Sequence, residues 1–278
     1  MNENLKCYNF QKIIYKNSLF NNEICATYII HLVGNNRYND IMKQLEIYHP
    51  TNILYILHNK GFKKCEKNKN IKFSPHDLVD AFLQIFIHAK KNNFNNILIL
   101  EDDFIFKDID NKSINNIINF LNNNKNKDFQ YLLGCIPLIK MPYSFDLNHF
   151  ISIVSLGAHA CIYSKKNRER ILDIDQINIK DWDVYNFLNS RRYTYYRPLC
   201  YQLFPMTDNS KNWGKDNYII YLLAKVTRLI FNFHKLDRQI EPGYTFFYIF
   251  SKIFFFLILF LIFIIIYIIL KKYNKKII

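Results

Sequence analysis

The chain has 278 residues and a formal net charge of +14, because 37 Lys and Arg stand against 23 Asp and Glu. This length holds one sizeable domain with room for an appendage, and the charge favours anionic partners such as nucleotides, phosphate-bearing acceptors or an anionic membrane face. The lysines are dispersed among Asn and Ile, so no nucleic-acid partner is expected.

In chain order, residues 1–25 are expected to form an N-terminal extension, without the basic and apolar regions of a secretory signal. An alternation of strands and helices follows. Strands are predicted at 26–33, 53–57, 97–100 and 129–133, with helices at 37–48, at about 77–91 and around Ile114, Ile117, Ile118 and Leu121. Ser74-Pro75 supplies a cap for the second helix. Strands alternating with helices in this way indicate parallel βαβ units, and hence an α/β fold.

The most informative stretch is the predicted strand that ends in Glu101-Asp102-Asp103. The aliphatic run 97–100 is typical of a strand buried on both faces. Ligands of open α/β sheets bind beyond the carboxyl ends of the strands. Adjacent carboxylates repel one another unless a cation lies among them, and their oxygens suit Mg²⁺ or Mn²⁺, which in turn holds a diphosphate. The alternative is a strand that runs into a solvated acidic turn.

The C-terminal part has the features of a membrane anchor. Residues 253–270 are an uninterrupted apolar run, close to the ~20 residues that cross a bilayer, so a transmembrane helix is predicted at 245–270 with a basic tail at 271–278. Residues 217–244 are predicted as a basic amphipathic helix and linker. Their polar stripe consists of Lys225, Arg228, Asn232 and Lys235. Such a helix either lies on anionic lipid or packs on the preceding domain.

The six cysteines are scattered, and none forms a Cys-x-x-Cys pair, so no zinc or redox motif is visible. This distribution is typical of small buried residues in a reducing compartment. A disulfide framework is not expected at this length.

Four segments in order resemble the family 25 glycosyltransferases, the lipopolysaccharide-type and collagen-galactosyltransferase-like enzymes. They are residues 28–37, 97–104 and 157–164, and the region from Asp181-Trp-Asp183 to Trp213, which looks most like members from large DNA viruses. The resemblance implies a GT-A fold over 26–216, a Rossmann-like sheet that binds a nucleotide-diphosphate sugar through Mn²⁺ or Mg²⁺. In the helix before the acidic strand, Ala81-Phe82 stands where bacterial members usually carry Ser-His.

On this resemblance, Asp103 is expected to contact the metal directly and Glu101 to support it, while Asp102 reaches the ribose or the metal's waters. Arg37 and Lys211 are candidates for binding the nucleotide or its phosphates, although Arg37 also fits a surface position. The polar loop that holds Lys211 also carries Trp213, which could stack on a sugar; alternatively, the loop is a solvated connector before the basic helix.

Two further pairs of residues have open roles. Gly157 is expected to allow close backbone approach, and His159 is either a substrate-site residue or a buried histidine with satisfied hydrogen bonds. An inverting transferase needs a base, for which Asp183 and Asp181 are candidates; alternatively, Asp181 caps a helix.

The sequence therefore predicts a membrane-anchored enzyme that moves a sugar, expected to be a UDP-linked hexose, onto a hydroxyl of a protein or glycan. An alternative is a transferase-like, membrane-tethered module that binds carbohydrate or a partner without turnover. A phosphoryl-transfer enzyme could also use an acidic strand end, but no phosphate-binding glycine loop is present.

Two arguments on membrane orientation conflict. An anchor inserted after synthesis leaves the catalytic domain cytosolic, whereas the positive-inside rule keeps the tail lysines in the cytosol. The first is preferred here, because so short a tail can be translocated.

Overall fold

The structure is a computed structural model that describes residues 6–20, 23–205 and 218–274. Its strands are β1 (Tyr8–Ile14), β2 (Ala26–Leu32), β3 (Ile53–Asn59), β4 (Ile97–Glu101), β5 (Ile105–Phe106), β6 (Gln130–Pro142), β7 (His149–Tyr163), β8 (Arg192–Tyr195) and β9 (Cys200–Tyr201). Its helices are α1 (Tyr38–Ile47), α2 (Ser74–Lys91), α3 (Asn111–Asn123), α4 (Lys165–Leu172), α5 (Trp182–Asn189), α7 (Tyr218–Phe233) and α8 (Gly243–Asn274), with a 3-10 turn, η3, at Gln176–Asn178.

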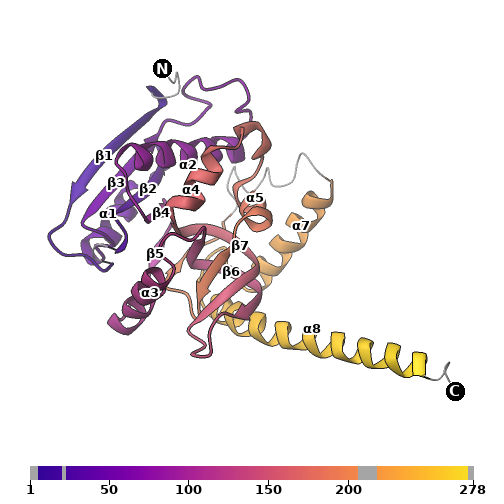
Figure 1. Cartoon of the computed structure of the whole chain (residues 1–278). Coiled ribbons are helices and arrows are strands. Elements are labelled where there is room, and N and C mark those ends of the chain that lie inside the picture. The colour runs from indigo at the N-terminus through magenta and orange to yellow at the C-terminus, as the bar shows by residue number, and fades with distance from the viewer. Residues whose placement is uncertain (1–5, 21–22, 206–217, 275–278) are drawn as a thin grey trace.

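A seven-stranded sheet with the order β1-β3-β2-β4-β7-β6-β8 forms the centre of the molecule (Figure 1). Within it, β2 pairs in parallel with both β3 and β4. Helix α1 connects β2 to β3, and α2 connects β3 to β4, as the predicted alternation requires. The predicted α/β fold class, with its Rossmann-like sheet, is therefore confirmed.

The other half of the sheet is mixed rather than purely parallel. Strand β7 runs antiparallel to both β4 and β6, and the strand predicted at 129–133 extends to Pro142 because β6 forms a long hairpin with β7. Gly134 lies at a register shift in this hairpin. A Cβ there would lie 1.9 Å from the carbonyl oxygen of Cys200, so only glycine permits this approach.

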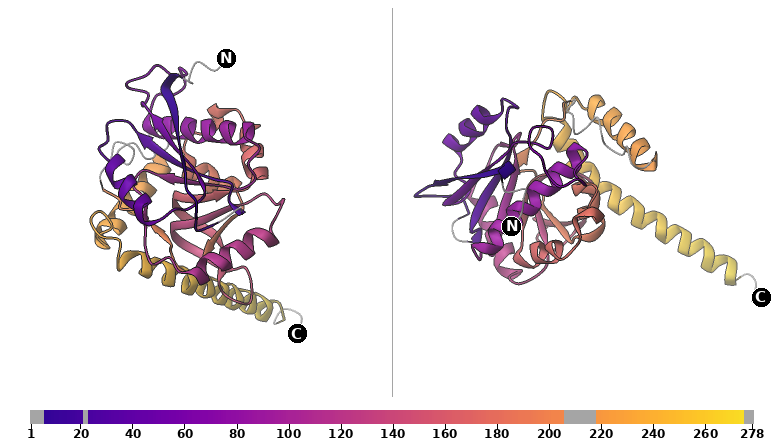
Figure 2. Two further views of the ribbon diagram at one scale, coloured as in Figure 1. Left: turned by 90° about the vertical axis from the view of Figure 1, so that its left-hand side faces the viewer. Right: turned by 90° about the horizontal axis from the view of Figure 1, so that it is seen from above.

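Helices cover both faces of the sheet, which makes three layers (Figure 2). One face packs against α1 and α3, and the other against α2, α4, α5 and the start of α8. Because neighbouring strand residues point to opposite faces, Ile29 of β2 joins the first core while Tyr28 and Ile30 join the second. The carboxyl ends of β2, β3 and β4 are left at one edge of the sheet.

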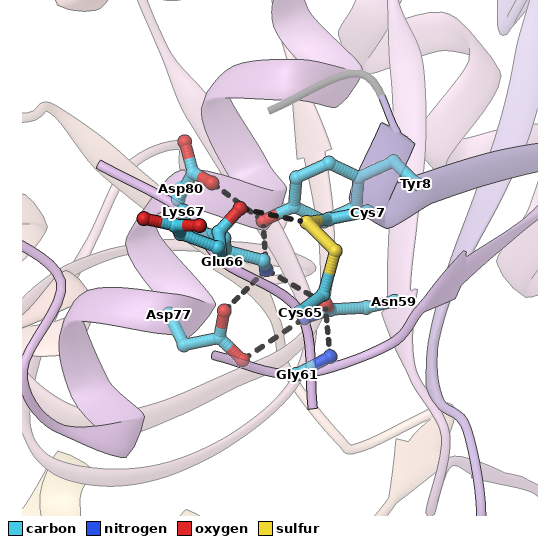
Figure 3. Close-up of a disulfide and its surroundings, with 9 residues drawn as sticks. All are labelled: Cys7, Tyr8, Asn59, Gly61, Cys65, Glu66, Lys67, Asp77 and Asp80. Atoms are coloured by element: carbon cyan, nitrogen blue, oxygen red, sulfur yellow. Dashed lines mark hydrogen bonds and ion pairs between the residues drawn. A yellow bond between two sulfur atoms is a disulfide. The ribbon is translucent and has the colours of Figure 1, made fainter. Parts of the chain in front are cut away.

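The segment expected as an N-terminal extension contains an edge strand of the sheet. Strand β1 runs antiparallel to β3, with Tyr8 opposite Asn59. This pairing brings Cys7 beside the loop after β3, where it forms a disulfide with Cys65 (Figure 3). The expectation of reduced cysteines is wrong for this pair, because 58 residues of sequence separation conceal a contact that only the sheet creates.

A buried polar network lies next to the disulfide (Figure 3). The Lys67 side chain is 1 % exposed and forms an ion pair with Asp77 of α2. Lys67 also donates hydrogen bonds to the Tyr8 hydroxyl at 2.6 Å and to the Asn59 side-chain oxygen at 2.7 Å. Tyr8 in turn donates to Asp80 at 2.6 Å. The disulfide and this network together hold β1, the loop after β3 and α2.

The C-terminal helix α8 is partly a member of the domain. Tyr244, Phe247, Tyr248 and Ser251 are buried, and α8 packs on β6. From Ile253 to Lys271 no described side chain is buried. The stretch Gly243–Lys271 is long and apolar enough to cross a membrane.

The core also continues past residue 216, where the end of the catalytic domain was expected. Phe231 of α7 and Leu236 are buried in the core that covers one face of the sheet. Helix α7 therefore packs on the domain, which was one of the two arrangements open for this segment.

Candidate functional site

The carboxyl ends of β2 and β4 bring Arg37, Asp102 and Asp103 together. The two strands are adjacent and parallel, with Ile30 opposite Glu101, so the residues that follow each strand share one edge of the sheet. Nη1 of Arg37 lies 2.7 Å from Oδ1 of Asp102 and 2.9 Å from Oδ2 of Asp103. Arg37 thus has a specific place in the site, and its guanidinium is a cation that offsets the repulsion between these two carboxylates.

Neutral donors complete the surroundings of the two carboxylates. Asp102 accepts hydrogen bonds from the Asn35 side chain and, at 3.2 Å, from the backbone N–H of Leu32. Asp103 accepts one from Nε2 of Gln202 at 2.9 Å. Gln202 reaches this position because β9 pairs with β5, the short strand that follows the acidic triplet.

Asn35 and Gln202 had no predicted role. The only sequence feature that could have indicated a site role for Asn35 is its place in the turn after the first predicted strand. The pairing that brings Gln202 to Asp103 spans 99 residues, and no local pattern announces it.

One oxygen of Asp103 lacks a hydrogen-bond partner among the described residues. This atom, Oδ1, is buried. Burial raises the pKa of Asp103 to about 6, although the Arg37 charge opposes the shift. Buried carboxylate oxygens are normally satisfied, so this atom marks a place where a cation or a donor group of a ligand would bind.

Glu101, at the end of β4, is under the electrostatic influence of Asp183 in the first turn of α5. Burial raises the pKa of Asp183 to about 7, helped by the charge of Asp181 and opposed by Arg192 and a hydrogen bond from the Gly157 backbone. Burial and the charges of Asp103 and Asp183 raise the pKa of Glu101 well above its usual range. A carboxyl group that ionises near pH 7 is suited to accept a proton during a reaction.

Asp181 and Asp183 have different surroundings. Asp181 accepts a hydrogen bond from the Val184 N–H at 3.0 Å and caps α5, so the capping alternative describes it. Between them, Trp182 stacks on Phe82 of α2 with the ring centres 4.3 Å apart. This packing fixes the first turn of α5, which carries Asp183.

Gly157 has a φ of +79°, a conformation that glycine adopts most readily. Its backbone forms a hydrogen bond to Asp183, whereas a Cβ at this position would meet only the His159 ring at 3.4 Å and the Phe204 ring at 3.9 Å, so the close approach expected here stays a prediction. His159, in contrast, is fully buried, and its Nε2 lies 3.3 Å from the carbonyl oxygen of Cys200. Burial lowers the pKa of His159 to about 4, so it is a neutral buried residue, but its Nδ1 has no hydrogen-bond partner among the described residues and the alternative of a fully satisfied histidine is met only in part.

Arg192 is a further residue that the sequence did not single out. It is 2 % exposed, donates from Nη2 to the carbonyl oxygen of Ser155 at 3.3 Å, and its charge acts on Asp183. Arg192 stands at the start of a short strand, and nothing in the neighbouring sequence indicates that its side chain is buried. Lys211 and Trp213 lie outside the described residues.

The arrangement fits a divalent ion held jointly by a carboxylate and a substrate, and it does not fit an ion held by the described side chains alone. Among the described residues, no three His, Cys, Asp or Glu side chains group closely enough to hold a metal ion by themselves. A cage built from Glu101, Asp102 and Asp103 is therefore not formed. Mg²⁺-type ions are commonly held by one or two carboxylates together with substrate phosphates, and the unpartnered Oδ1 of Asp103 fits that mode.

A pocket of about 520 Å³ lies beside the start of α5, between the loop after β3 and the segment around η3. Its lining includes amide side chains (Asn68, Asn70, Gln176), cationic ones (Lys72, Lys180) and the rings of Phe73 and His76. His76 also acts electrostatically on Asp181, which directly follows Lys180. The pocket is thus adjacent to the cap of the helix that carries Asp183.

No protein-family model matches the chain. No curated protein matches it either. Solved structures with some likeness include A197 from STIV, at 10 % identity and a TM-score of 0.38, covering 66 % of this chain and 86 % of that one. A glycosyltransferase involved in the glycosylation of the major capsid of PBCV-1 has the same identity and TM-score and covers 68 % and 97 %.

A mannose-1-phosphate geranyltransferase from Thermus thermophilus is similar at 10 % identity and a TM-score of 0.36, covering 62 % of this chain and 73 % of its own. The solved structures that resemble this chain thus include a glycosyltransferase and a sugar-phosphate transferase, at a distance that carries no activity over from them.

Proposed function

We propose that this protein is a glycosyltransferase that moves a sugar from a nucleotide-diphosphate sugar, a UDP-linked hexose, to an acceptor hydroxyl. The observation that carries the proposal is the meeting of two groups at one edge of the Rossmann-like sheet. Arg37, Asp102 and Asp103 form a charged cluster suited to the nucleotide diphosphate, and the half-buried Asp183, with a pKa raised to about 7, is suited to accept a proton. The resemblance to family 25 assigns the acidic motif the same role.

The charged cluster binds and orients the donor. Arg37 holds Asp102 and Asp103 side by side, and Gln202 occupies Oδ2 of Asp103, which leaves the unpartnered Oδ1 for the metal or the donor. Mn²⁺ or Mg²⁺, when bound there with the diphosphate, supplies Lewis-acid stabilisation of the leaving nucleotide. Burial and the neighbouring carboxylates raise the pKa of Glu101, which weakens its negative charge beside the diphosphate.

Asp183 carries the proton transfer in an inverting reaction. The acceptor hydroxyl oxygen forms a bond to the anomeric carbon while the bond from that carbon to the phosphate oxygen breaks. The nucleoside diphosphate leaves with the electron pair, and the hydroxyl proton passes to the Asp183 carboxylate. The pocket beside Asp181 offers amide and aromatic side chains, the groups that suit a sugar-bearing acceptor.

The test is a panel of UDP- and GDP-hexoses incubated with the full chain in detergent, with Mn²⁺, with Mg²⁺ or with EDTA. We expect nucleoside diphosphate release with one donor, loss of release in EDTA, and a fall of about 10²-fold or more for Asp103→Asn. Asp40→Asn, an exposed carboxylate paired only with Lys43 in the described structure, is the matched control and keeps full activity. Absence of binding and of release with every donor would refute the proposal.

One observation favours a second candidate, a carbohydrate-binding module without turnover. Arg37 already neutralises two of the three carboxylates, which leaves a site that can bind without catalysing. The panel separates the two functions, because a pure binding module binds a donor but releases no nucleoside diphosphate.

The anchor and its orientation are part of the proposal. Helix α8 crosses the membrane, and the disulfide between Cys7 and Cys65 indicates that the domain matures in an oxidising compartment. The positive-inside rule agrees, because it keeps the lysines at 271, 272, 275 and 276 in the cytosol. We therefore propose the orientation opposite to the one preferred from the sequence. In sealed vesicles that expose the C-terminal tail on the outside, the domain should resist added protease. Digestion of the domain would support the cytosolic orientation instead.

A further inference from the structure

Helix α7 exposes an apolar stripe that the proposed reaction does not use. Its members follow one another at intervals of three or four residues: Tyr218, Leu222, Val226, Leu229 and Phe233. Because an α-helix has about 3.6 residues per turn, these side chains share one narrow face. Their exposed fractions range from 47 % to 82 %. Soluble surfaces rarely carry so continuous an apolar strip without a partner.

The opposite side of α7 attaches it firmly to the domain. Phe231 is 3 % exposed, and its ring centre lies 4.5 Å from that of Phe204 and 6.4 Å from that of Phe247 in α8. Just beyond the helix, His234 stacks on Phe246 of α8 at 4.5 Å. The direction in which the apolar stripe faces is therefore set by contacts with the first turns of α8.

The figures show where helix α7 lies relative to α8. Helix α7 and the free part of α8 extend from the same side of the domain in Figure 1 and in the view from above in Figure 2. The exposed apolar surface of α8 begins with Phe246 and Ile249, next to the end of α7. A bilayer crossed by the free part of α8 would thus lie on the side of the domain that carries α7.

The charge of α7 matches an anionic surface. The helix has no Asp or Glu, and Lys225 is exposed beside the apolar stripe. An amphipathic helix with apolar and basic faces lies in the plane of the membrane interface, with its cationic groups at the headgroups.

We infer that α7 is a second membrane contact, embedded in the surface of an anionic bilayer with its apolar stripe among the acyl chains. The inference rests on the proposed membrane anchoring by α8. Lipid, rather than a second copy of the chain, is the occupant because the stripe continues into the exposed surface of a helix able to cross the membrane. Together, α7 and α8 hold the domain at the bilayer in one fixed orientation.

The test uses the full chain in vesicles of phosphatidylcholine with phosphatidylserine as the minor lipid. The photoreactive residue benzoylphenylalanine replaces Leu222 or Leu229 in α7. It also replaces Phe256 in α8 as a positive control, and Ile47, which is 70 % exposed at the end of α1, as a negative control. After irradiation, mass spectrometry identifies what each position has attached to.

We expect lipid adducts at positions 222, 229 and 256 and none at 47. Adducts at 256 without any at 222 and 229, or adducts there to a second copy of the chain, would overturn the inference while leaving the anchor intact. No lipid adduct at 256 would refute the anchor itself. Lys225→Glu should reduce the yield at position 229 several-fold in vesicles with phosphatidylserine, and an unchanged yield would remove the role of the anionic lipid.

Discussion

The hydroxyl of Tyr244 accepts a hydrogen bond from the Gln202 backbone N–H at 3.0 Å and donates one to the Gln202 carbonyl oxygen at 3.1 Å. Tyr244 belongs to the first turn of α8, and the side chain of Gln202 donates to Asp103. A single residue, Gln202, therefore connects the first turn of α8 to Asp103 in the proposed donor site. The start of α8 and the proposed site belong to one folded unit.

We expect Tyr244→Phe to lower turnover about three- to tenfold, because Gln202 would no longer be held against Asp103 and a lost buried hydrogen bond is worth about 1 kcal/mol. The measurement is kcat with saturating donor, alongside thermal unfolding. Tyr248→Phe is the matched control: its hydroxyl is also buried but contacts Thr194 at 3.3 Å instead of the site. Equal losses of activity in the two variants would show that Tyr244 acts through stability alone.

Replacement of Arg37 tests whether its charge holds the acidic cluster. Arg37→Ala leaves Asp102 and Asp103 to repel each other, so donor affinity should fall about 10-fold or more, with a smaller effect for Arg37→Lys because a lysine keeps the charge but not the geometry. Donor affinity is read by calorimetry. Arg238→Ala, at an arginine whose side chain is 70 % exposed, should leave it unchanged. Unaltered binding in Arg37→Ala would exclude Arg37 from the site.

The pH dependence of activity should report Asp183. Its carboxylate must be ionised to accept a proton, so the transfer rate should rise with pH through about 7, the pKa to which burial raises this group. Asp183→Asn should abolish transfer at all pH values while donor binding is retained. A rate that does not vary between pH 5 and 8 would remove Asp183 as the base.

The stability of the fold should decrease over the pH range in which the transfer rate rises. The folded state keeps Asp183 protonated up to about pH 7, whereas the unfolded chain ionises it near its usual value of about 4, so the free energy of unfolding should decrease as pH rises between these values. Asp183→Asn should flatten this decrease in thermal melts. Asp40→Asn, which changes an exposed carboxylate, should leave it as it is.

The disulfide should contribute about 2–4 kcal/mol to stability, because it constrains the unfolded chain over a long loop. Cys65→Ser should lower the melting temperature, and dithiothreitol should lower that of the wild type while leaving the variant unaffected. Cys25→Ser, at a free cysteine, should behave as the wild type does. A reductant that leaves the wild-type melting temperature unchanged would contradict this contribution.

The sequence by itself determined the elements whose formation depends on residues close together in the chain. Periodicity placed β2, α1, α2 and α3, because an amphipathic stripe and a buried aliphatic run are local consequences of burying one face. The apolar run 253–270 likewise predicted the exposed part of α8. The acidic triplet after β4 pointed to the edge of the sheet where the site lies.

Only the tertiary structure decided which distant groups meet. Gln202 reaches Asp103 through the pairing of β5 with β9, and Cys7 reaches Cys65 because β1 joins the sheet beside β3. The same holds for His159, whose burial follows from the hairpin of β6 and β7. These contacts arise from strand pairings across long sequence separations, which leave no periodic trace in the residues themselves, and they set the charge, burial and pKa on which the proposed chemistry depends.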